Sequence, residues 1–140
     1  MMHIGNIRNI LVLAAGMLLI SSCQESKNAR FERETQDYTR KNCPQIVDPK
    51  CPWIVLDSLV FHDDGTSNYS HYYSVNTDSV DLKLLNGLWA EFEGTLRKGV
   101  INSVELRHVK EAELNVRYIY LDSKTHKELA KFVFTKEDYE

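Results

Sequence analysis

Apolar residues from position 54 onward follow the period of a β-strand in four segments. These segments are 54–62, 69–75, 113–122 and 128–135. Every second side chain of a strand shares one face, so alternating or continuous apolar runs of this length predict strands. The first two segments flank the turn sequence DDGTSN and the last two flank SKTHK, which predicts two β-hairpins.

A helical period lies between the two hairpins. From Ser79 to Lys98 the apolar side chains form one stripe, at Leu84, Leu85, Leu88, Trp89, Phe92 and Leu96. This spacing predicts an amphipathic helix of about 30 Å. Asp78 or Ser79 is suited to cap its start, and Gly99 is suited to end it.

The order of hairpin, helix and hairpin predicts an α+β fold. We expect a four-stranded antiparallel sheet in β-β-α-β-β order, with one long amphipathic helix packed on one face. Four strands at about 4.8 Å spacing are roughly twice as wide as one 10 Å helix. The tether described below, residues 101–112 or a partner therefore has to cover the remainder. Ser103 is suited to cap a short helix over residues 104–110.

The first 23 residues follow the pattern of an export signal. Arg8 gives a positively charged start, the apolar run ILVLAAGMLLI follows at 10–20, and small residues precede Cys23. An apolar core of this length suits a signal peptide, whereas a helix that spans a bilayer needs about 20 apolar residues. A short transmembrane anchor is the alternative, and its length disfavours it.

The end of this segment, Ile20-Ser21-Ser22-Cys23, resembles the lipobox of bacterial lipoproteins. In that family the chain is cleaved just before the cysteine, whose sulfur receives a diacylglycerol. The resemblance implies that residues 1–22 are a signal peptide that is removed and that Cys23 is the lipidation site. The expected partner of the mature protein is then the membrane, which it binds through the lipid anchor. Gln24 stands where an aspartate commonly signals inner-membrane retention, which favours the outer membrane of the cell envelope. The mature part is similar to small envelope lipoproteins of unknown function.

The remaining chain divides into two parts. Residues 23–42 alternate charges around only three apolar side chains after Cys23, namely Ala29, Phe31 and Tyr38. This composition predicts a flexible tether, and a frayed helix over 30–41 is the alternative because the residues tolerate a helix but form no apolar stripe. Residues 43–140 then form a single α+β domain of ordinary size.

The net charge and the absence of known catalytic motifs argue against several classes of function. The 17 basic and 20 acidic residues give a net charge of −3, without the basic cluster that a nucleic-acid partner requires. The sequence has no G-x-S-x-G elbow, no H-E-x-x-H motif and no glycine-rich phosphate loop. We therefore expect no enzyme, no cofactor and no nucleic-acid partner.

Two Cys-Pro pairs stand in the stretch NCPQIVDPKCPW. Seven residues separate Cys43 from Cys51, which does not match the C-x-x-C spacing of redox catalysts. Zinc sites need three or four ligands, and the nearest histidine, His62, lies in a predicted strand. Once Cys23 carries lipid, an oxidising compartment favours a Cys43–Cys51 disulfide. Two unpaired buried thiols are the alternative.

Two histidines and two acids surround the first predicted turn. His62, Asp63, Asp64 and His71 invite a metal hypothesis, because all four can be ligands. Asp-Asp-Gly is also ordinary turn chemistry, however, and histidines at facing strand ends are more often solvated. We expect no metal here.

Two predicted strands each carry a tyrosine pair on one side. Tyr69 and Tyr73 flank His71 on one strand, and Tyr118 and Tyr120 share a face of another. Tyrosine is enriched where partners dock, because the ring buries apolar area while the hydroxyl stays solvated. The four tyrosines are the candidate binding surface. The alternative is that they cover the sheet where the helix leaves it bare.

These patterns predict a lipid-anchored envelope lipoprotein that acts as a non-catalytic binding or accessory module. Its expected partner is another envelope protein, a peptide or a glycan. The alternative is a small membrane-anchored inhibitor or immunity protein against a toxin or hydrolase, acting through a loop such as HDDGTSN.

Overall fold

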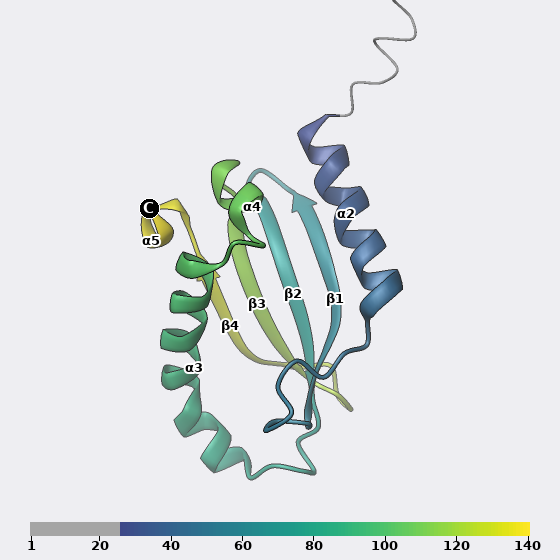
Figure 1. Cartoon of the computed structure of the whole chain (residues 1–140). Coiled ribbons are helices and arrows are strands. Elements are labelled where there is room, and N and C mark those ends of the chain that lie inside the picture. The colour runs from purple at the N-terminus through teal and green to yellow at the C-terminus, as the bar shows by residue number, and fades with distance from the viewer. Residues whose placement is uncertain (1–25) are drawn as a thin grey trace, which may run out of the picture. The chain divides into compact units, whose positions relative to one another are not determined.

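The computed structural model describes residues 26–140. The expected signal peptide and Cys23 lie outside the described residues. Phe31–Glu140 form one compact unit, and the fold is given for that unit (Figure 1). Within the described residues no helix is long and apolar enough to cross a membrane.

Four strands form one sheet in the order β1-β2-β3-β4. The strands are β1 (Ile54–Asp63), β2 (Ser67–Val75), β3 (Asn115–Asp122) and β4 (Glu128–Phe134), close to the four predicted segments. β1 with β2 and β3 with β4 pair antiparallel, as the hairpins predicted, but β2 and β3 run parallel. The fold is α+β with a mixed sheet, so the prediction of an antiparallel sheet is wrong.

The helical connection explains the parallel pair. It contains α3 (Leu82–Asn102) and α4 (Arg107–Glu111). The 21 residues of α3 span about 30 Å, about the length of the nine residues of β2. The chain therefore returns to the end of the sheet from which β2 started, and Asn68 lies opposite Asn115. Parallel neighbours need a crossover of this kind.

The predicted long helix is present, shifted by a few residues. Its N-cap is Asp81, whose carboxylate accepts a hydrogen bond from the Lys83 N–H at 2.8 Å. Leu85 is buried, whereas Leu84 is exposed. Within the predicted stripe, Trp89, Phe92 and Leu96 are half-buried against the core.

The predicted short helix is also present, as α4. Ser103 Oγ accepts a hydrogen bond from the Leu106 N–H at 3.1 Å, just before α4 begins at Arg107. Val109 of α4 is fully buried. A last short helix, α5 (Lys136–Tyr139), follows β4, and Asp138 in it accepts a hydrogen bond from Arg97 of α3 at 2.5 Å.

A helix that the prediction did not favour precedes the sheet. This helix, α2 (Lys27–Asn42), takes the place of most of the expected tether, and its Phe31 and Thr35 are buried. The Phe31 ring stacks on Phe61 of β1 and on His108 of α4, with centroid distances of 5.6 and 5.5 Å. The Thr35 hydroxyl donates to the Phe31 carbonyl at 2.9 Å, so its polar atom is satisfied inside the helix. The expectation of a flexible tether is therefore wrong for residues 31–42.

The segment from α2 to residue 45 closes the open edge of β1. Thr39 Oγ1 accepts a hydrogen bond from the Leu59 N–H at 2.9 Å and donates to the Leu59 carbonyl at 3.0 Å. Gln45 exchanges two backbone hydrogen bonds with Leu56, at 3.0 and 2.8 Å. An edge strand with free N–H and C=O groups invites uncontrolled pairing, and these contacts satisfy such groups on both sides of the irregularity between Leu56 and Ser58.

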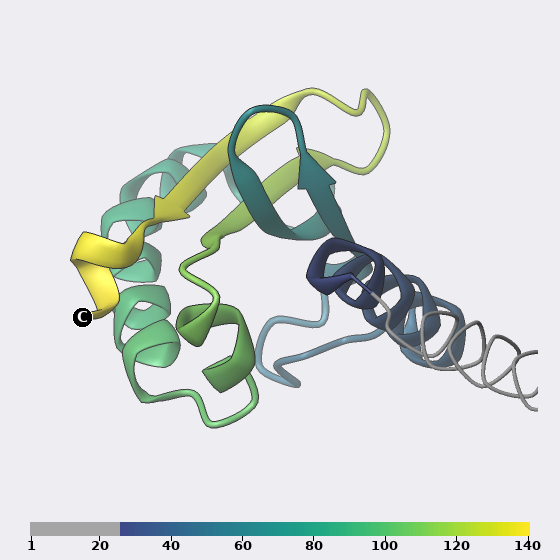
Figure 2. The same ribbon diagram turned by 90° about the horizontal axis from the view of Figure 1, so that it is seen from above.

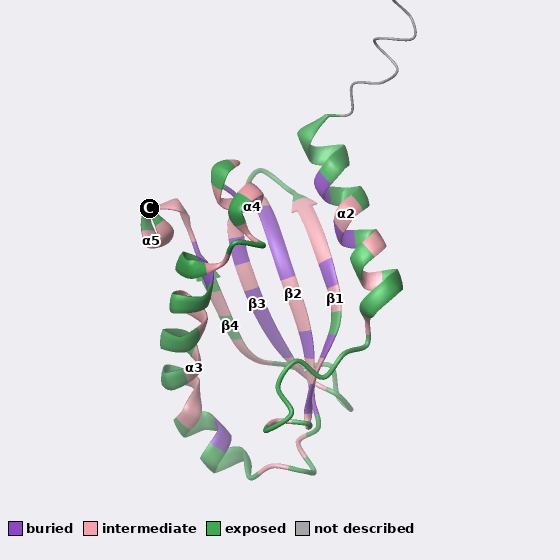
Figure 3. Ribbon diagram, in the orientation of Figure 1, coloured by how far each residue is buried: buried purple, intermediate pink, exposed green. Residues whose placement is uncertain are grey.

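The helices lie on one side of the sheet (Figure 2). α2 stands over the β1 edge and α3 over the β4 edge (Figure 1). Burial is concentrated on the strands and on a few helical positions that face them (Figure 3). The apolar core therefore forms between the inner face of the sheet and helices placed over its edges.

Replacing Phe31 with alanine tests whether α2 is part of the folded unit. Phe31 is 5% exposed, so the change Phe31→Ala removes a buried ring and should lower the free energy of unfolding by about 3–5 kcal/mol. The matched control is Gln36→Ala on the exposed side of the same helix, which should change stability by less than about 0.5 kcal/mol. Urea unfolding measures both. If the two variants were equally stable, α2 would not be part of the folded unit, and the prediction of a flexible tether would be correct.

Candidate binding cleft

The inner face of the sheet is hollowed at its centre, between the two helices at its edges. A hollow of about 590 Å³ lies over β2 and β3, bounded by α2, the turn from α3 to α4 and the segment 43–53. A second hollow of about 320 Å³ lies between that segment and α3. Val47 and Tyr73 line both, so we describe them together as the cleft. Each volume is in the range of about 300–1,000 Å³ that is typical of small-molecule sites.

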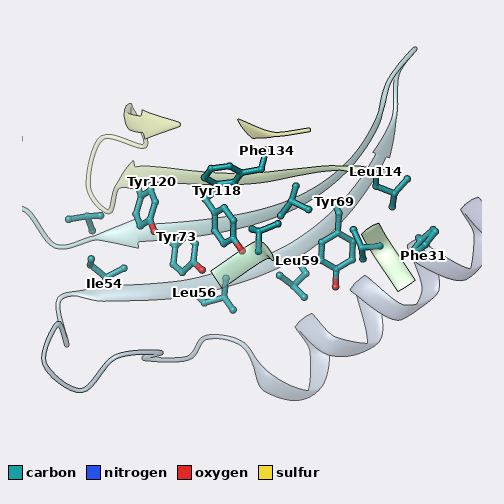
Figure 4. Packing of buried hydrophobic residues seen from close by; sticks show 14 of the residues in the cluster. Phe31, Ile54, Leu56, Leu59, Tyr69, Tyr73, Leu114, Tyr118, Tyr120 and Phe134 are labelled. Atoms are coloured by element: carbon teal, nitrogen blue, oxygen red, sulfur yellow. The ribbon is translucent and has the colours of Figure 1, made fainter. Parts of the chain in front are cut away.

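The floor of the cleft consists of the four predicted tyrosines and His71. The parallel register sets His71 beside Tyr118 and Tyr73 beside Tyr120. The first pair of rings stacks at 4.4 Å and 12°, and the second at 4.7 Å and 9°. Tyr69 meets His71 edge-on at 5.6 Å. Figure 4 shows the tyrosine hydroxyl oxygens directed away from the strands that carry the rings.

The structure thus brings the predicted tyrosines together, but not on a half-exposed surface. Their exposed fractions are 8% for Tyr69, 7% for Tyr73 and Tyr118, and 5% for Tyr120. Tyr69, Tyr73 and Tyr118 line the larger hollow, whereas Tyr120 packs against Trp89 and Phe92 of α3 at centroid distances of 5.2 and 6.2 Å. The alternative, that the rings cover sheet left bare by the helix, therefore describes the first three and not Tyr120. A large partner cannot dock on them directly, whereas a ligand that enters the cleft can reach their hydroxyls.

The floor hydroxyls differ from the other tyrosine hydroxyls. Tyr38 donates to Gln45 at 3.1 Å, Tyr139 donates to the Leu114 carbonyl at 2.8 Å, and Tyr72 lies 3.4 Å from His62 Nε2. The four floor hydroxyls have no hydrogen-bond partner among residues 26–140. In this range no wholly enclosed side-chain oxygen lacks a partner, so these hydroxyls are in contact with the cleft. They are available to a ligand.

Burial keeps the floor uncharged at neutral pH. It raises the pKa of Tyr69 and Tyr118 to about 12, and it also raises the pKa of Tyr73 and Tyr120. The same desolvation lowers the pKa of His71 to about 4. A charged form in this apolar layer would lose the hydration that stabilises it.

The hydrogen bond of His71 fixes which ring nitrogen faces a ligand. His71 Nδ1 lies 3.2 Å from the carbonyl oxygen of Arg117. A carbonyl only accepts, so Nδ1 carries the proton and Nε2 is left as an acceptor. The raised pKa values of the tyrosines oppose phenolate formation, so at neutral pH the floor presents neutral hydroxyls and the neutral His71 ring.

Carboxylates line both hollows of the cleft. Glu34 of α2 and Glu105 of the α3–α4 turn line the larger hollow, and Asp48 and Glu91 line the smaller one. Glu34 Oε2 lies 3.2 Å from His108 Nε2. In the described part of the chain, no lysine or arginine lines either hollow.

The two Cys-Pro cysteines flank the segment that forms one wall of the cleft. Cys43 and Cys51 are half-buried against the core, and both are free thiols in the structure. The disulfide therefore has no support here and stays a prediction. Burial raises the pKa of both thiols, with added effects from Asp57 at Cys43 and Asp48 at Cys51. A reactive cysteine has the opposite shift.

The histidines of the metal hypothesis lie on opposite faces of the sheet. His71 belongs to the floor, whereas His62 follows the inward-facing Phe61 and pairs with Tyr72 on the outer face. Asp64 accepts a hydrogen bond from Asn68 at 3.3 Å within the turn. Among residues 26–140 there is no group of three side chains placed to hold a metal ion.

Sequence reasoning did not assign His71, Glu34 or Glu105 to the binding surface. His71 was detectable, because it alternates with Tyr69 and Tyr73 on one face of a strand. Glu34 and Glu105 carried no signal, because their position depends on where α2 and the α3–α4 turn pack.

Comparison with known proteins gives a family and a fold. No curated protein sequence matches the chain. The fold is similar to the crystal structure of a "putative secreted protein" from Pseudomonas aeruginosa, with a TM-score of 0.62 and 11% sequence identity over 84% of this chain and 99% of that one. At this identity the likeness concerns the fold alone.

A family model also matches residues 26–130, a range that includes every residue of the cleft. This model describes a domain of unknown function, DUF8479. It covers most of the 140 residues, from the start of the described chain into β4. The chain therefore belongs to the DUF8479 family.

Proposed function

We propose that this protein is an exported, lipid-anchored binding module without catalytic activity, and that it holds a small ligand in the cleft. The observation that carries this proposal is the floor, where the hydroxyls of four largely buried tyrosines face the cleft without a hydrogen-bond partner among residues 26–140. A mostly apolar hollow with a few convergent polar groups is typical of a ligand site.

Export and anchoring are supported by the sequence. The lipobox-like residues end at Cys23, and the family match begins soon after, at residue 26. The description of the Pseudomonas aeruginosa protein as secreted agrees with export. Eight residues from Cys23 to Phe31 reach at most about 28 Å, so a lipid at Cys23 would hold the cleft close to the membrane of the cell envelope. The outer membrane is the proposed location.

A glycine beside the cleft provides a test of ligand entry. Gly99 of α3 lines the larger hollow, and no heavy atom lies within 4 Å of the position that a Cβ would take. A side chain added there enters open space instead of clashing. Gly94 of the same helix has equally free surroundings but does not line the cleft.

The Gly99→Leu variant should lose ligand binding, whereas Gly94→Leu should keep it. The probe is 4-phenylbutanol, which by general ligand efficiency should bind with a Kd of about 4 mM, measured by saturation-transfer NMR on the lipidated protein in nanodiscs. Gly99→Leu should weaken binding at least about fivefold, because the leucine occupies the cleft. Both variants should fold, since each gains up to about 1 kcal/mol of helix propensity. Equal binding by the two variants would exclude the cleft as the site.

The Cys23→Ala variant tests the anchor. It should abolish incorporation of an alkyne-labelled fatty acid and release the protein from the membrane fraction, because no sulfur remains to carry lipid. Cys43→Ala is the matched control and should keep the label. Labelling of the Cys23→Ala variant at the level of the natural chain would rule out Cys23 as the lipidation site.

A further inference from the structure

From the charges and acceptors of the cleft we infer that its ligand is an organic cation with an apolar body, whose ammonium group lies between Glu34 and Glu105, near Tyr69. This inference rests on the proposed binding function and adds the chemical class of the ligand. Nothing in the family description or the similar structure specifies such a ligand.

The first reason is the charge of the lining. Glu34 of α2 and Glu105 of the α3–α4 turn both line the larger hollow, and Asp48 and Glu91 line the smaller one. Glu105 has no ion-pair partner among the described residues, whereas Glu34 pairs with His108. Because no lysine or arginine among the described residues lines either hollow, an anionic ligand would meet the Glu105 carboxylate without a compensating cation in the lining.

The second reason is the set of acceptors at one end of the floor. Tyr69, Glu34 and Glu105 line the same hollow, and the two carboxylate charges add to the effect of burial in raising the pKa of Tyr69. Phenol oxygens accept hydrogen bonds from N–H groups, and His71 Nε2 is a further acceptor beside Tyr69. An ammonium group donates to such acceptors, and aromatic rings also attract it.

The third reason is the apolar path that leads away from this end. Tyr73 and Tyr118 line the larger hollow next to Tyr69, and Val47 joins it to the smaller hollow. Phe92 and Leu96 of α3 line that second part. The apolar body of the ligand would lie along this path, since burying apolar surface contributes about 25 cal/mol per Å².

A lysine-containing peptide is the competing cationic partner. The cleft consists of two hollows of about 590 and 320 Å³, which suits a small molecule that is largely enclosed. A peptide would instead need an extended groove or a free sheet edge. Thr39 and Gln45 already occupy part of the β1 edge, and no residue of β4, the other edge strand, lines either hollow. The structure therefore favours the small molecule.

Three probes of one shape test the charge of the ligand. They are 4-phenylbutylammonium, 4-phenylbutanol and 4-phenylbutanoate, titrated against the lipidated protein in nanodiscs with empty nanodiscs as the blank. We expect the cation to bind at least about tenfold tighter than the alcohol and the anion to bind weakest, with the advantage of the cation shrinking as salt is added. The dipeptide lysyl-leucine should bind more weakly than 4-phenylbutylammonium.

Two variants locate the charge. Glu105→Gln should reduce the preference for the cation over the alcohol about fivefold, measured as the ratio of the two Kd values in that variant. Glu128→Gln removes the same charge from an exposed position on β4 outside the cleft, and it should keep the full preference. Because both variants carry the same net charge, a difference between them cannot come from overall electrostatics.

The outcomes separate the ligand class from the binding function. If the cation and the alcohol bind equally, or the anion binds best, the inferred class is wrong while the binding function stands. If lysyl-leucine binds tighter than 4-phenylbutylammonium, the ligand is a peptide. If none of the probes binds above the blank, both the ligand class and the proposed binding function are wrong. If the Glu105→Gln and Glu128→Gln variants prefer the cation over the alcohol to the same extent, the ammonium group does not lie beside Glu105.

Discussion

The parallel pairing of β2 with β3 is the constraint on which the cleft depends. It sets Tyr73 beside Tyr120 and His71 beside Tyr118 on the inner face, where the rings stack at 4.7 and 4.4 Å. An antiparallel pairing would place other residues side by side and break up this layer. The stacked rings cover the middle of the sheet, Trp89 and Phe92 of α3 pack on Tyr120, and the hydroxyls reach the cleft. The parallel pairing therefore determines both the aromatic packing and the groups that the floor presents to the cleft.

The position of α2 determines whether the inner face of the sheet, which the aromatic rings cover, also leaves room for a ligand. The Thr39 hydroxyl donates to and accepts from the backbone of Leu59, and this holds α2 over the β1 edge instead of over the centre. α3 lies over the opposite edge and is tied to α5 by Arg97 and Asp138. Two helices at the edges leave a hollow between them, whereas one helix across the middle would have filled it.

The sequence predicted the elements better than their arrangement. Strong periods at 54–62 and 79–98 identified the strands and the long helix, because local propensity and burial agree there. The prediction that β2 and β3 pair antiparallel was wrong, because the direction of pairing depends on the path of α3 and not on any residue of these strands. α2 was missed as a docked helix because its inward residues include Thr35 and Thr39, which pack and hydrogen-bond but do not count as an apolar stripe. The alternation of the tyrosines along the strands predicted that they share one face of the sheet. Their burial could not be predicted, because it depends on where the helices pack.

The most direct test is the ring-to-ring NOE pattern of the aromatic side chains, recorded with and without 4-phenylbutylammonium. We expect NOEs within the pairs Tyr73–Tyr120 and His71–Tyr118, and we expect the added probe to shift the resonances of Tyr69, Tyr73 and Tyr118 in particular. Absence of these two NOEs would contradict the parallel register. Shifts confined to residues of the outer face, such as Tyr72, would contradict the cleft as the binding site.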